Sequence, residues 1–355
     1  MNKAVETPMP SGPETVEITS SGKRVAVPAV CLQGRTVMVT GGWARHAVIT
    51  DEEWLPGKLI ADLNAFLASL RRSTLNPDYF SFAQPFFEPV PRHPFRFAWD
   101  NIAAIPISDF SDWWERRVSH DLRKDVKRAE KRGVQVRVVE FDDNLVRGIK
   151  ALYDETPFRQ GRRFWHYGKD LETVRRENSS YLDRSTFIGA FLEDQLIGFI
   201  KMVRVDSVER MMQILARDDQ QDKRPMNALI AKAVEVAAGR SASYLTYGRY
   251  TYDGRRSSSV ALFKRRNGFE EILFPRYYVP FTAKGRCLVL SGLHLGVRRL
   301  IPERIYENLR VIRARLIYGL KSSGASRDAG VGAKASESAP VPRTGRDAQA
   351  PVAGS

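Results

Sequence analysis

The order of elements predicted between residues 185 and 281 constrains the fold of this chain more than any other feature. Apolar runs typical of strands cover residues 185–192, 196–205 and 210–216, and the polar stretch 193–195 predicts a hairpin turn. Helical spacing of apolar residues then predicts two helices, which are separated by a short strand and followed by two final strands. The helices cover residues 223–238 and 257–267, and the short strand covers residues 244–247. Few common folds place an antiparallel meander before two crossover helices.

The second predicted helix ends in a phrase that resembles a family motif. Residues 260–269 read VALFKRRNGF, in which Gly268 fits the left-handed residue that closes a helix. The phrase is similar to A-x-x-L-Y-x-x-x-G-F of the GNAT acyltransferases. A predicted strand (134–139) and two predicted helices (142–153 and 170–181) precede it in the GNAT order. The resemblance implies an α+β fold, with a GNAT-like, mixed and mainly antiparallel sheet flanked by helices.

A narrower resemblance begins at Trp113-Trp114. The segment that follows, residues 120–136, reads HDLRKDVKRAEKRGVQV. It is similar to the helix that opens the second half of Fem-type peptidyltransferases and of their GNAT relatives in polysaccharide gene clusters. Because those proteins carry two GNAT-like halves, residues 24–107 are expected to form a shortened GNAT-like N-terminal half before a GNAT-like domain at 108–283.

The remaining segments differ in composition. Residues 1–23 and 322–355 contain few large apolar residues, so both ends are predicted to be disordered. Residues 284–321 are predicted to form a basic amphipathic helical segment, with its apolar stripe at Ile305, Leu309, Ile312, Leu316 and Leu320. Such a helix suits peripheral contact with the inner membrane. It equally suits packing on the protein core.

Composition narrows the class of protein. The net charge of +15 favours polyanionic partners, such as phosphate-bearing cofactors, nucleic acid or anionic lipid. Two cysteines, Cys31 and Cys287, suggest neither a disulfide framework nor a metal site. The N-terminal segment has no apolar signal region, and no run of residues is apolar enough to span a bilayer. A cytoplasmic location is therefore expected.

The best candidate for an acceptor site is the connection at residues 155–169. It displays arginines, which suit carboxylate or phosphate, among aromatic residues. The predicted substrate-binding residues are Arg159, Gln160, Arg162, Arg163, Tyr167 and, inside the strand 210–216, Gln213. The simpler interpretation of residues 155–169 is a surface loop anchored by its aromatic residues.

The GNAT resemblance also implies a donor, acyl-CoA (acetyl-CoA or a longer chain), and no metal. In GNAT enzymes a glycine-containing loop opens the long helix and holds the CoA diphosphate. Here that stretch is DKRPMNA, without glycine, so side-chain charge would replace the open backbone. The predicted cofactor-binding residues are Lys223, Arg224, Asn227, Ala228 and Ser258.

The sequence offers several candidates for the catalytic groups. The tyrosine that serves as acid in the GNAT motif is Phe263 here. One of the clustered Tyr247, Tyr250 and Tyr252 is expected to substitute, and Tyr247 is the predicted catalytic residue. Glu155 and His166 are the titratable candidates for proton transfer. Ser258 belongs to a serine cluster that also suits a helix cap.

The resemblances lead to one main interpretation and two rivals. The main one is a GNAT-type acyltransferase that acts on an amine or hydroxyl of an anionic acceptor, such as a cell-envelope or polysaccharide precursor. One rival is a Fem-type peptidyltransferase that uses aminoacyl-tRNA. The other is a catalytically degenerate GNAT-fold binding module at the membrane surface.

Overall fold

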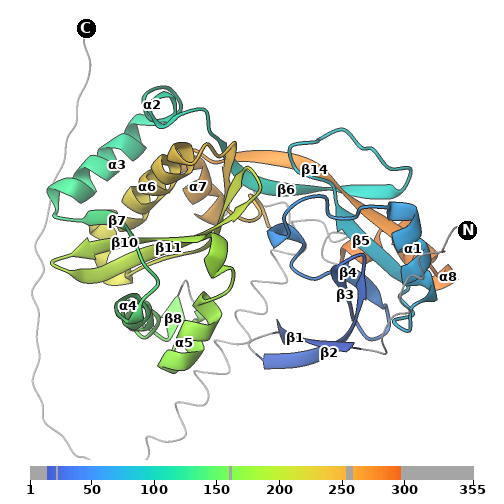
Figure 1. Cartoon of the computed structure of the whole chain (residues 1–355). Coiled ribbons are helices and arrows are strands. Elements are labelled where there is room, and N and C mark those ends of the chain that lie inside the picture. The colour runs from blue at the N-terminus through green and yellow to red at the C-terminus, as the bar shows by residue number, and fades with distance from the viewer. Residues whose placement is uncertain (1–13, 21–22, 160–161, 253–258, 297–355) are drawn as a thin grey trace, which may run out of the picture. The chain divides into compact units, whose positions relative to one another are not determined.

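A computed structural model describes residues 14–20, 23–159, 162–252 and 259–296 (Figure 1). A 12-stranded sheet runs through them in the order β1-β2-β3-β4-β5-β14-β6-β13-β12-β11-β10-β7. Helices flank the sheet, so the architecture is the α+β arrangement that the sequence predicts. The predicted segment 284–321 is described only as far as residue 296, and the predicted tail 322–355 lies outside the described residues.

The GNAT-like half follows the predicted order closely. Its strands pair antiparallel, except that β12 and β13 run parallel over three residue pairs. The strands are β7 (Gln135–Val139), β10 (Ser185–Leu192), β11 (Gln195–Val205), β12 (Val208–Ala216) and β13 (Tyr244–Thr246). A bulge at Met212 places Met211 and Gln213 on opposite faces of β12.

Helices cover both faces of this half (Figure 1). The Ala-rich α6 (Pro225–Gly239) and α3 (His120–Lys131) pack over one apolar face. The opposite face is covered by α4 (Asp143–Tyr153) and α5 (Leu171–Asn178). The short α7 (Ser259–Arg266) follows β13 and ends before Gly268, whose φ of 82° fits the predicted helix stop.

The stretch that begins at Trp113-Trp114, which the Fem-type resemblance leads into a helix, is divided in the structure. Phe110–Asp112 form α2, and Trp113–Arg117 form a π-helical turn that buries the Trp113 ring. A new helix, α3, then starts because the Ser119 hydroxyl accepts a hydrogen bond from the Leu122 N–H. The π-turn therefore sets the two tryptophans against Phe110.

The N-terminal half is a smaller mixed sheet with one helix. Its core gathers the buried Phe66 and Leu70 of α1 around Phe80. The elements are β1 (Glu14–Ser20), β2 (Lys23–Leu32), β3 (Arg35–Thr40), β4 (His46–Ile49), β5 (Tyr79–Ala83) and α1 (Leu63–Arg72). The prediction of disorder for residues 1–23 is wrong for β1. The β-branched residues of that strand pair antiparallel with β2.

Two long strands join the halves. β6 (Arg96–Pro106) and β14 (Glu270–Pro280) pair antiparallel along their length, and β14 also pairs with β5. The sequence predicts two final strands, but the structure has the single strand β14, which continues through Pro275. The predicted boundary at residue 107/108 therefore separates strands that belong to one sheet. α8 (Ala283–Ser291) follows β14.

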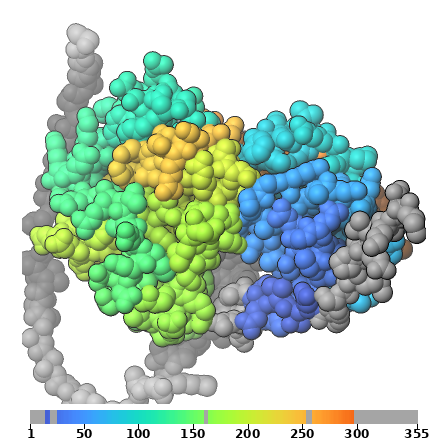
Figure 2. Space-filling model, in the orientation of Figure 1, coloured from blue at the N-terminus to red at the C-terminus, as the bar shows by residue number. Residues whose placement is uncertain are grey.

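The two halves also meet away from the sheet. Figure 2 shows N-terminal residues directly beside residues of the GNAT-like half. Tyr181 Oη donates to Asp51 Oδ2 at 2.9 Å, and Arg184 Nη2 donates to the Trp54 carbonyl at 2.8 Å. The Gly57 N–H donates to Asp206 Oδ2 at 2.8 Å. These contacts fix the segment between Asp51 and Gly57 on the GNAT-like half.

No helix within the described residues is long and apolar enough to cross a membrane.

Candidate functional site

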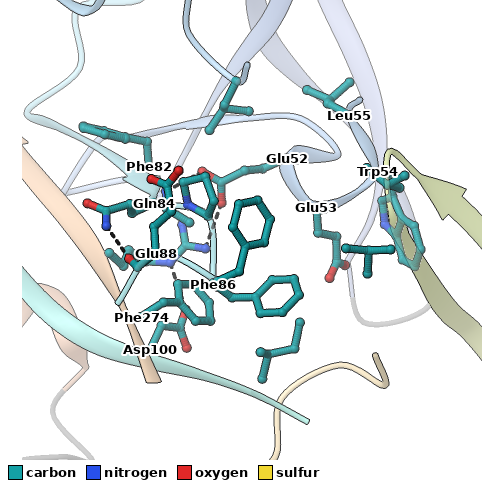
Figure 3. A pocket seen from close by; sticks show the side chains of 18 of the residues that line it. Glu52, Glu53, Trp54, Leu55, Phe82, Gln84, Phe86, Glu88, Asp100 and Phe274 are labelled. Carbon is teal, nitrogen blue, oxygen red and sulfur yellow. Dashed lines mark hydrogen bonds and ion pairs between the residues drawn. The ribbon is translucent and has the colours of Figure 1, made fainter. Parts of the chain in front are cut away.

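A cavity of about 880 Å³ lies over the strands that join the two halves (Figure 3). Its apolar surface is formed by Phe86, Ile102, Val208 and Phe274, which pack together in one cluster. One side is closed by the segment from Asp51 to Ile60, which we call the roof segment. A cavity of this size, with apolar walls and a few polar groups, is typical of a small-molecule site.

The roof segment takes its shape from local backbone geometry. Asp51 and Gly57 both have left-handed φ values, 56° and 70°, and so reverse the chain at either end of it. Between them Glu52–Trp54 form a single 3₁₀ turn, η1. The Trp54 ring stacks on Tyr181, with centroids 6.2 Å apart. These constraints direct Glu52 and Glu53 toward the cavity (Figure 3).

A chain of ion pairs forms one wall of the cavity. Arg276 of β14 donates to Glu52 Oε2 at 2.8 Å and to Asp100 Oδ2 at 2.9 Å. Arg249 lies 3.2 Å from the same Asp100 oxygen. Burial raises the pKa of Asp100, but the charges of Arg276 and Arg249 outweigh it, so the pKa is lowered. This wall therefore carries fixed, mutually compensated charges.

Glu53 differs from these paired carboxylates. Within the described residues its side chain has no hydrogen-bond or ion-pair partner, and it reaches into the cavity (Figure 3). Burial raises the pKa of Glu53, and the charge of Arg210 opposes that shift. A carboxylate whose pKa lies nearer to neutrality is a stronger base than an ordinary glutamate.

Arg210 is the matching unpaired cation. It stands on β12 opposite Thr246 of β13, at the last of the three paired positions. Its Nε is buried and has no hydrogen-bond partner, and its guanidinium lies 5.7 Å from the centre of the Phe86 ring. Burial lowers its pKa. Its charge acts on Glu53, although no direct ion pair joins these two described residues.

None of the predicted site residues that the structure describes lines this cavity. In the predicted acceptor loop, Arg159 donates to Glu155 at 2.5 Å and to the Ala216 carbonyl at 2.9 Å. Glu155 also accepts hydrogen bonds from the backbone N–H groups of Asp218 and Asp219. The two side chains therefore bind one another and the end of β12, which leaves neither free for a substrate or a proton.

The other residues of that loop are placed in two ways. His166 is buried among Tyr153, Phe164 and Trp165, and burial lowers its pKa to about 3, so it stays neutral where a proton shuttle would titrate. Arg163 and Tyr167 are exposed. Gln160 lies outside the described residues. Only the backbone of Arg162 is described, in a two-residue pairing with Arg159.

Two further candidates belong to other structural clusters. Gln213 donates to Tyr153 Oη at 2.6 Å, a contact that joins β12 to α4. Tyr247 packs on the α6 face of the sheet, against Phe269 and under the Lys264 ammonium. Burial raises the pKa of Tyr247 to about 12, so its hydroxyl stays protonated. Both lie outside the lining of the cavity.

The predicted donor loop is closed upon itself. Asp218–Lys223 form a 3₁₀ helix, η4, before Arg224, whose φ is 59°. Lys223 lies 3.6 Å from Asp222, and Arg224 lies 3.2 Å from Asp125. The backbone N–H groups of Asn227 and Ala228 already donate to the Arg224 carbonyl.

This closure bears on how a CoA diphosphate could bind. The predicted cations are matched with acids, and part of the backbone cradle is occupied. The Asn227 side chain is used as well, because it donates to Asn267 at 3.0 Å. Ser258 lies outside the described residues.

The sequence contained only weak signals for Glu53 and Arg210. Glu53 follows Glu52 in a loop that shows no apolar period and lies outside the GNAT-like order. Arg210 stands at the first position of the predicted strand, where a charged residue is ordinary, whereas Gln213 is a polar residue inside that strand. The proximity of Glu53 and Arg210 depends on the pairing of the two halves, which neither local pattern encodes.

No group of three or more histidine, cysteine or acidic side chains in the described ranges is arranged to hold a metal ion.

Comparisons with known proteins place the fold. No protein-family model matches the sequence, and neither does any curated protein. One similar solved structure is the C-terminal domain of a protein from Agrobacterium fabrum that is named as a lysylphosphatidylglycerol synthetase. It has a TM-score of 0.50 at 13% identity, covering 76% of this chain and 88% of that one. FemX has a TM-score of 0.50 at 11% identity, covering 79% and 90%. The chain therefore has a GNAT-like fold with Fem-related structural relatives.

Proposed function

From this GNAT-like fold we propose that the chain is a transferase that moves an acyl or aminoacyl group from an activated donor to an amine bound in the cavity. The observation that carries the proposal is Glu53, an unpaired carboxylate with a raised pKa that lines a cavity of about 880 Å³ and stays accessible to solvent. An ammonium is not nucleophilic, so such a transfer needs a base at the amine. The two structural neighbours, which are named as a lysylphosphatidylglycerol synthetase and as FemX, support a transferase.

In the proposed step the amine nitrogen attacks the acyl carbon of the donor and forms a C–N bond. The bond between that carbon and the donor's sulfur or oxygen breaks. Glu53 takes the proton that the amine loses, and the leaving thiolate or alkoxide takes a proton from water. The charged wall of Glu52, Arg276 and Asp100 holds its shape because its charges are already compensated.

The donor is a separate part of the proposal. An acyl-CoA remains the donor that the GNAT-like order implies, with Lys223 and Arg224 near its phosphates. The closed loop of Asp218–Lys223 favours a second candidate, an aminoacyl ester carried by tRNA, because such a donor needs no diphosphate cradle. The basic surface of α3 and the net charge of +15 suit a polynucleotide.

Binding measurements separate the two donors. Acetyl-CoA and aminoacyl-tRNA are each titrated into the full chain between 50 and 200 mM salt. tRNA binding that weakens steeply with salt, together with no heat from acetyl-CoA, supports the tRNA donor because phosphate contacts release counterions. Saturable acetyl-CoA binding that the double variant Lys223→Ala/Arg224→Ala weakens supports the CoA donor.

Replacement of Glu53 tests the proposed base. With the donor that binds, transfer of its labelled acyl group to a panel of amines is measured for wild type and for Glu53→Gln. The variant keeps the side-chain shape but cannot accept the proton, so kcat/KM is expected to fall by about 100-fold or more at an unchanged melting temperature. Glu235→Gln on the surface of α6 is the matched control. Wild-type turnover by Glu53→Gln contradicts the proposal.

A further inference from the structure

The carboxylates and cations that line the cavity are mostly satisfied by each other. Arg276 binds Glu52 and Asp100, Arg92 lies 2.9 Å from Glu88, and Arg249 lies against Asp100. Asp51 accepts from Tyr181, Asp206 accepts from the Gly57 N–H, and Lys58 donates to the Ala61 carbonyl. Within the described lining, this leaves one carboxylate, Glu53, and one guanidinium, Arg210, without a polar partner.

These two groups lie on opposite structural parts of the cavity. Glu53 belongs to the roof segment of the N-terminal half, whereas Arg210 belongs to β12 of the GNAT-like half. Both side chains line the same cavity, and within the described residues no direct ion pair joins them. A ligand that carries one charge at each end can therefore meet both groups inside this cavity.

A buried guanidinium N–H without a hydrogen bond is unfavourable, because water has been removed from it and no acceptor has replaced the water. The buried Nε of Arg210 is in that state. The Phe86 ring beside it offers only a cation–π contact. An anionic ligand group would supply the missing acceptors, and a carboxylate matches the guanidinium with two parallel hydrogen bonds.

The rest of the lining favours a carboxylate over a phosphate. The cavity has more carboxylates than cations. Its carboxylates are Asp51, Glu52, Glu53, Glu88, Asp100 and Asp206. Its cations are Lys58, Arg92, Arg210, Arg249 and Arg276. The single free arginine can neutralise a monoanion such as a carboxylate. A phosphate dianion would keep one negative charge and be repelled by the excess carboxylates of the cavity. Between the two charged ends, Phe86, Ile102 and Phe274 offer apolar and aromatic contact.

We propose that the cavity recognises an amino-acid-like acceptor, in which Glu53 receives the amine and Arg210 holds a carboxylate a few bonds away. This rests on the proposed function, since it names the acceptor class of the same site. Arg210 then determines specificity, because an amine without the carboxylate leaves the guanidinium unsatisfied.

Equilibrium binding to the full chain tests the inference without any donor. The reference probe is L-phenylalanine. Phenethylamine lacks its carboxylate, and 3-phenylpropanoate lacks its amine. The fourth probe is the phosphonate analogue of phenylalanine. L-Phenylalanine is expected to bind wild type at least about 10-fold more tightly than either single-charge probe, because a charge-assisted hydrogen bond contributes about 1.5–3 kcal/mol. Equal affinity for L-phenylalanine and phenethylamine overturns the inference, and tighter binding of the phosphonate overturns the choice of carboxylate.

Two variants assign the ends of the ligand. Arg210→Gln is expected to lower affinity for L-phenylalanine by about 10-fold or more and to leave phenethylamine unchanged. Glu53→Gln is expected to weaken phenethylamine and to leave 3-phenylpropanoate unchanged. Arg116→Gln, an exposed arginine on the π-turn, is the matched control. If Arg210→Gln does not fold, Arg210→Lys keeps the charge but loses the two parallel bonds, and the wild-type probe series decides by itself.

The outcomes also separate this inference from the proposed function. L-Phenylalanine binding that needs Arg210, together with normal transfer by Glu53→Gln, rejects the base but keeps the acceptor class. Transfer to plain amines that Arg210→Gln leaves unchanged rejects the acceptor class and keeps the transferase.

Discussion

At the scale of single residues, the buried His166 and the half-buried His46 shape how the stability of the protein responds to acid. His166 lies inside an aromatic cluster, and burial lowers its pKa to about 3. His46 Nε2 forms a hydrogen bond of 2.8 Å with Ser81 Oγ. Desolvation, together with the charges of Arg276 and His294, lowers the pKa of His46 to about 4. Both are therefore neutral in the folded state at pH values where an unfolded histidine is charged.

The sign of the pH effect follows from proton uptake. Below about pH 6.5 the unfolded chain binds protons at both histidines, whereas the folded chain does not do so until near pH 4 or 3. The free energy of unfolding should fall as the pH drops from 6.5 to 4.5, with up to about 1.4 kcal/mol per pH unit from each histidine. Urea unfolding at several pH values measures it. His166→Phe should show a shallower pH dependence than wild type, and an equal slope would contradict this account.

The same residues show where sequence reasoning stops. His166 and Glu155 have the right chemistry for proton transfer, but burial and ion pairing depend on neighbours that are distant in sequence. The sequence identifies side chains that are capable of proton transfer. It does not predict the buried, paired environment that these side chains have in the fold. Glu53 shows the converse, since a loop glutamate becomes unusual only where the two halves meet.

At the scale of elements, the contact between the 155–169 connection and η4 is expected to be structural. Glu155 joins Arg159 to the backbone of Asp218 and Asp219, and both side chains are almost buried. Glu155→Ala leaves Arg159 with its more exposed partner Asp218 and the Ala216 carbonyl, and is expected to cost about 1–3 kcal/mol of stability. Thermal melting measures the loss.

A double-mutant cycle provides the control for this pair. Adding Arg159→Ala to Glu155→Ala removes the charge that has lost its nearest partner, so the double variant should lose less stability than the sum of the two single variants. If Arg159→Ala instead keeps the wild-type melting temperature and abolishes transfer, the loop binds substrate as the sequence suggested. That result would contradict the structural role.

The sequence predicts best those helices and strands in which apolar residues recur with a clear helical or strand spacing, or run continuously. The strands β10 to β12 and the helices α4 and α6 fall within a few residues of their predicted ranges, because each buries one face or is buried throughout. The π-turn at Trp113 and the single long β14 were missed. Helix breaks and strand continuity through Pro275 depend on packing against partners.

At the scale of the whole molecule, β14 ties both halves together. It lies between β5 and β6, so the N-terminal core includes Tyr277 and Val279 from near the end of the described chain. A chain that ends at residue 268 lacks this strand and is expected to lose its cooperative urea transition in both halves. A chain that ends at residue 296 should keep one transition, with far-UV and aromatic near-UV signals coinciding.

The outcome that would contradict this view is specific. If the chain that ends at residue 268 still unfolds cooperatively, with burial of the aromatic residues around Phe80, then the N-terminal half is an independent domain. The predicted boundary at residue 107/108 would then describe the folding unit better than the sheet does.

The insertion of β14 between β5 and β6 also has a consequence for synthesis on the ribosome. Domains generally fold in turn from the N-terminus as the chain emerges. Here the edges of β5 and β6 that pair with β14 stay without their partner until residues 270–280 leave the exit tunnel. For most of translation the N-terminal half is therefore an unfinished sheet, and its unpaired edges are open to pairing with other chains until the last strand is made.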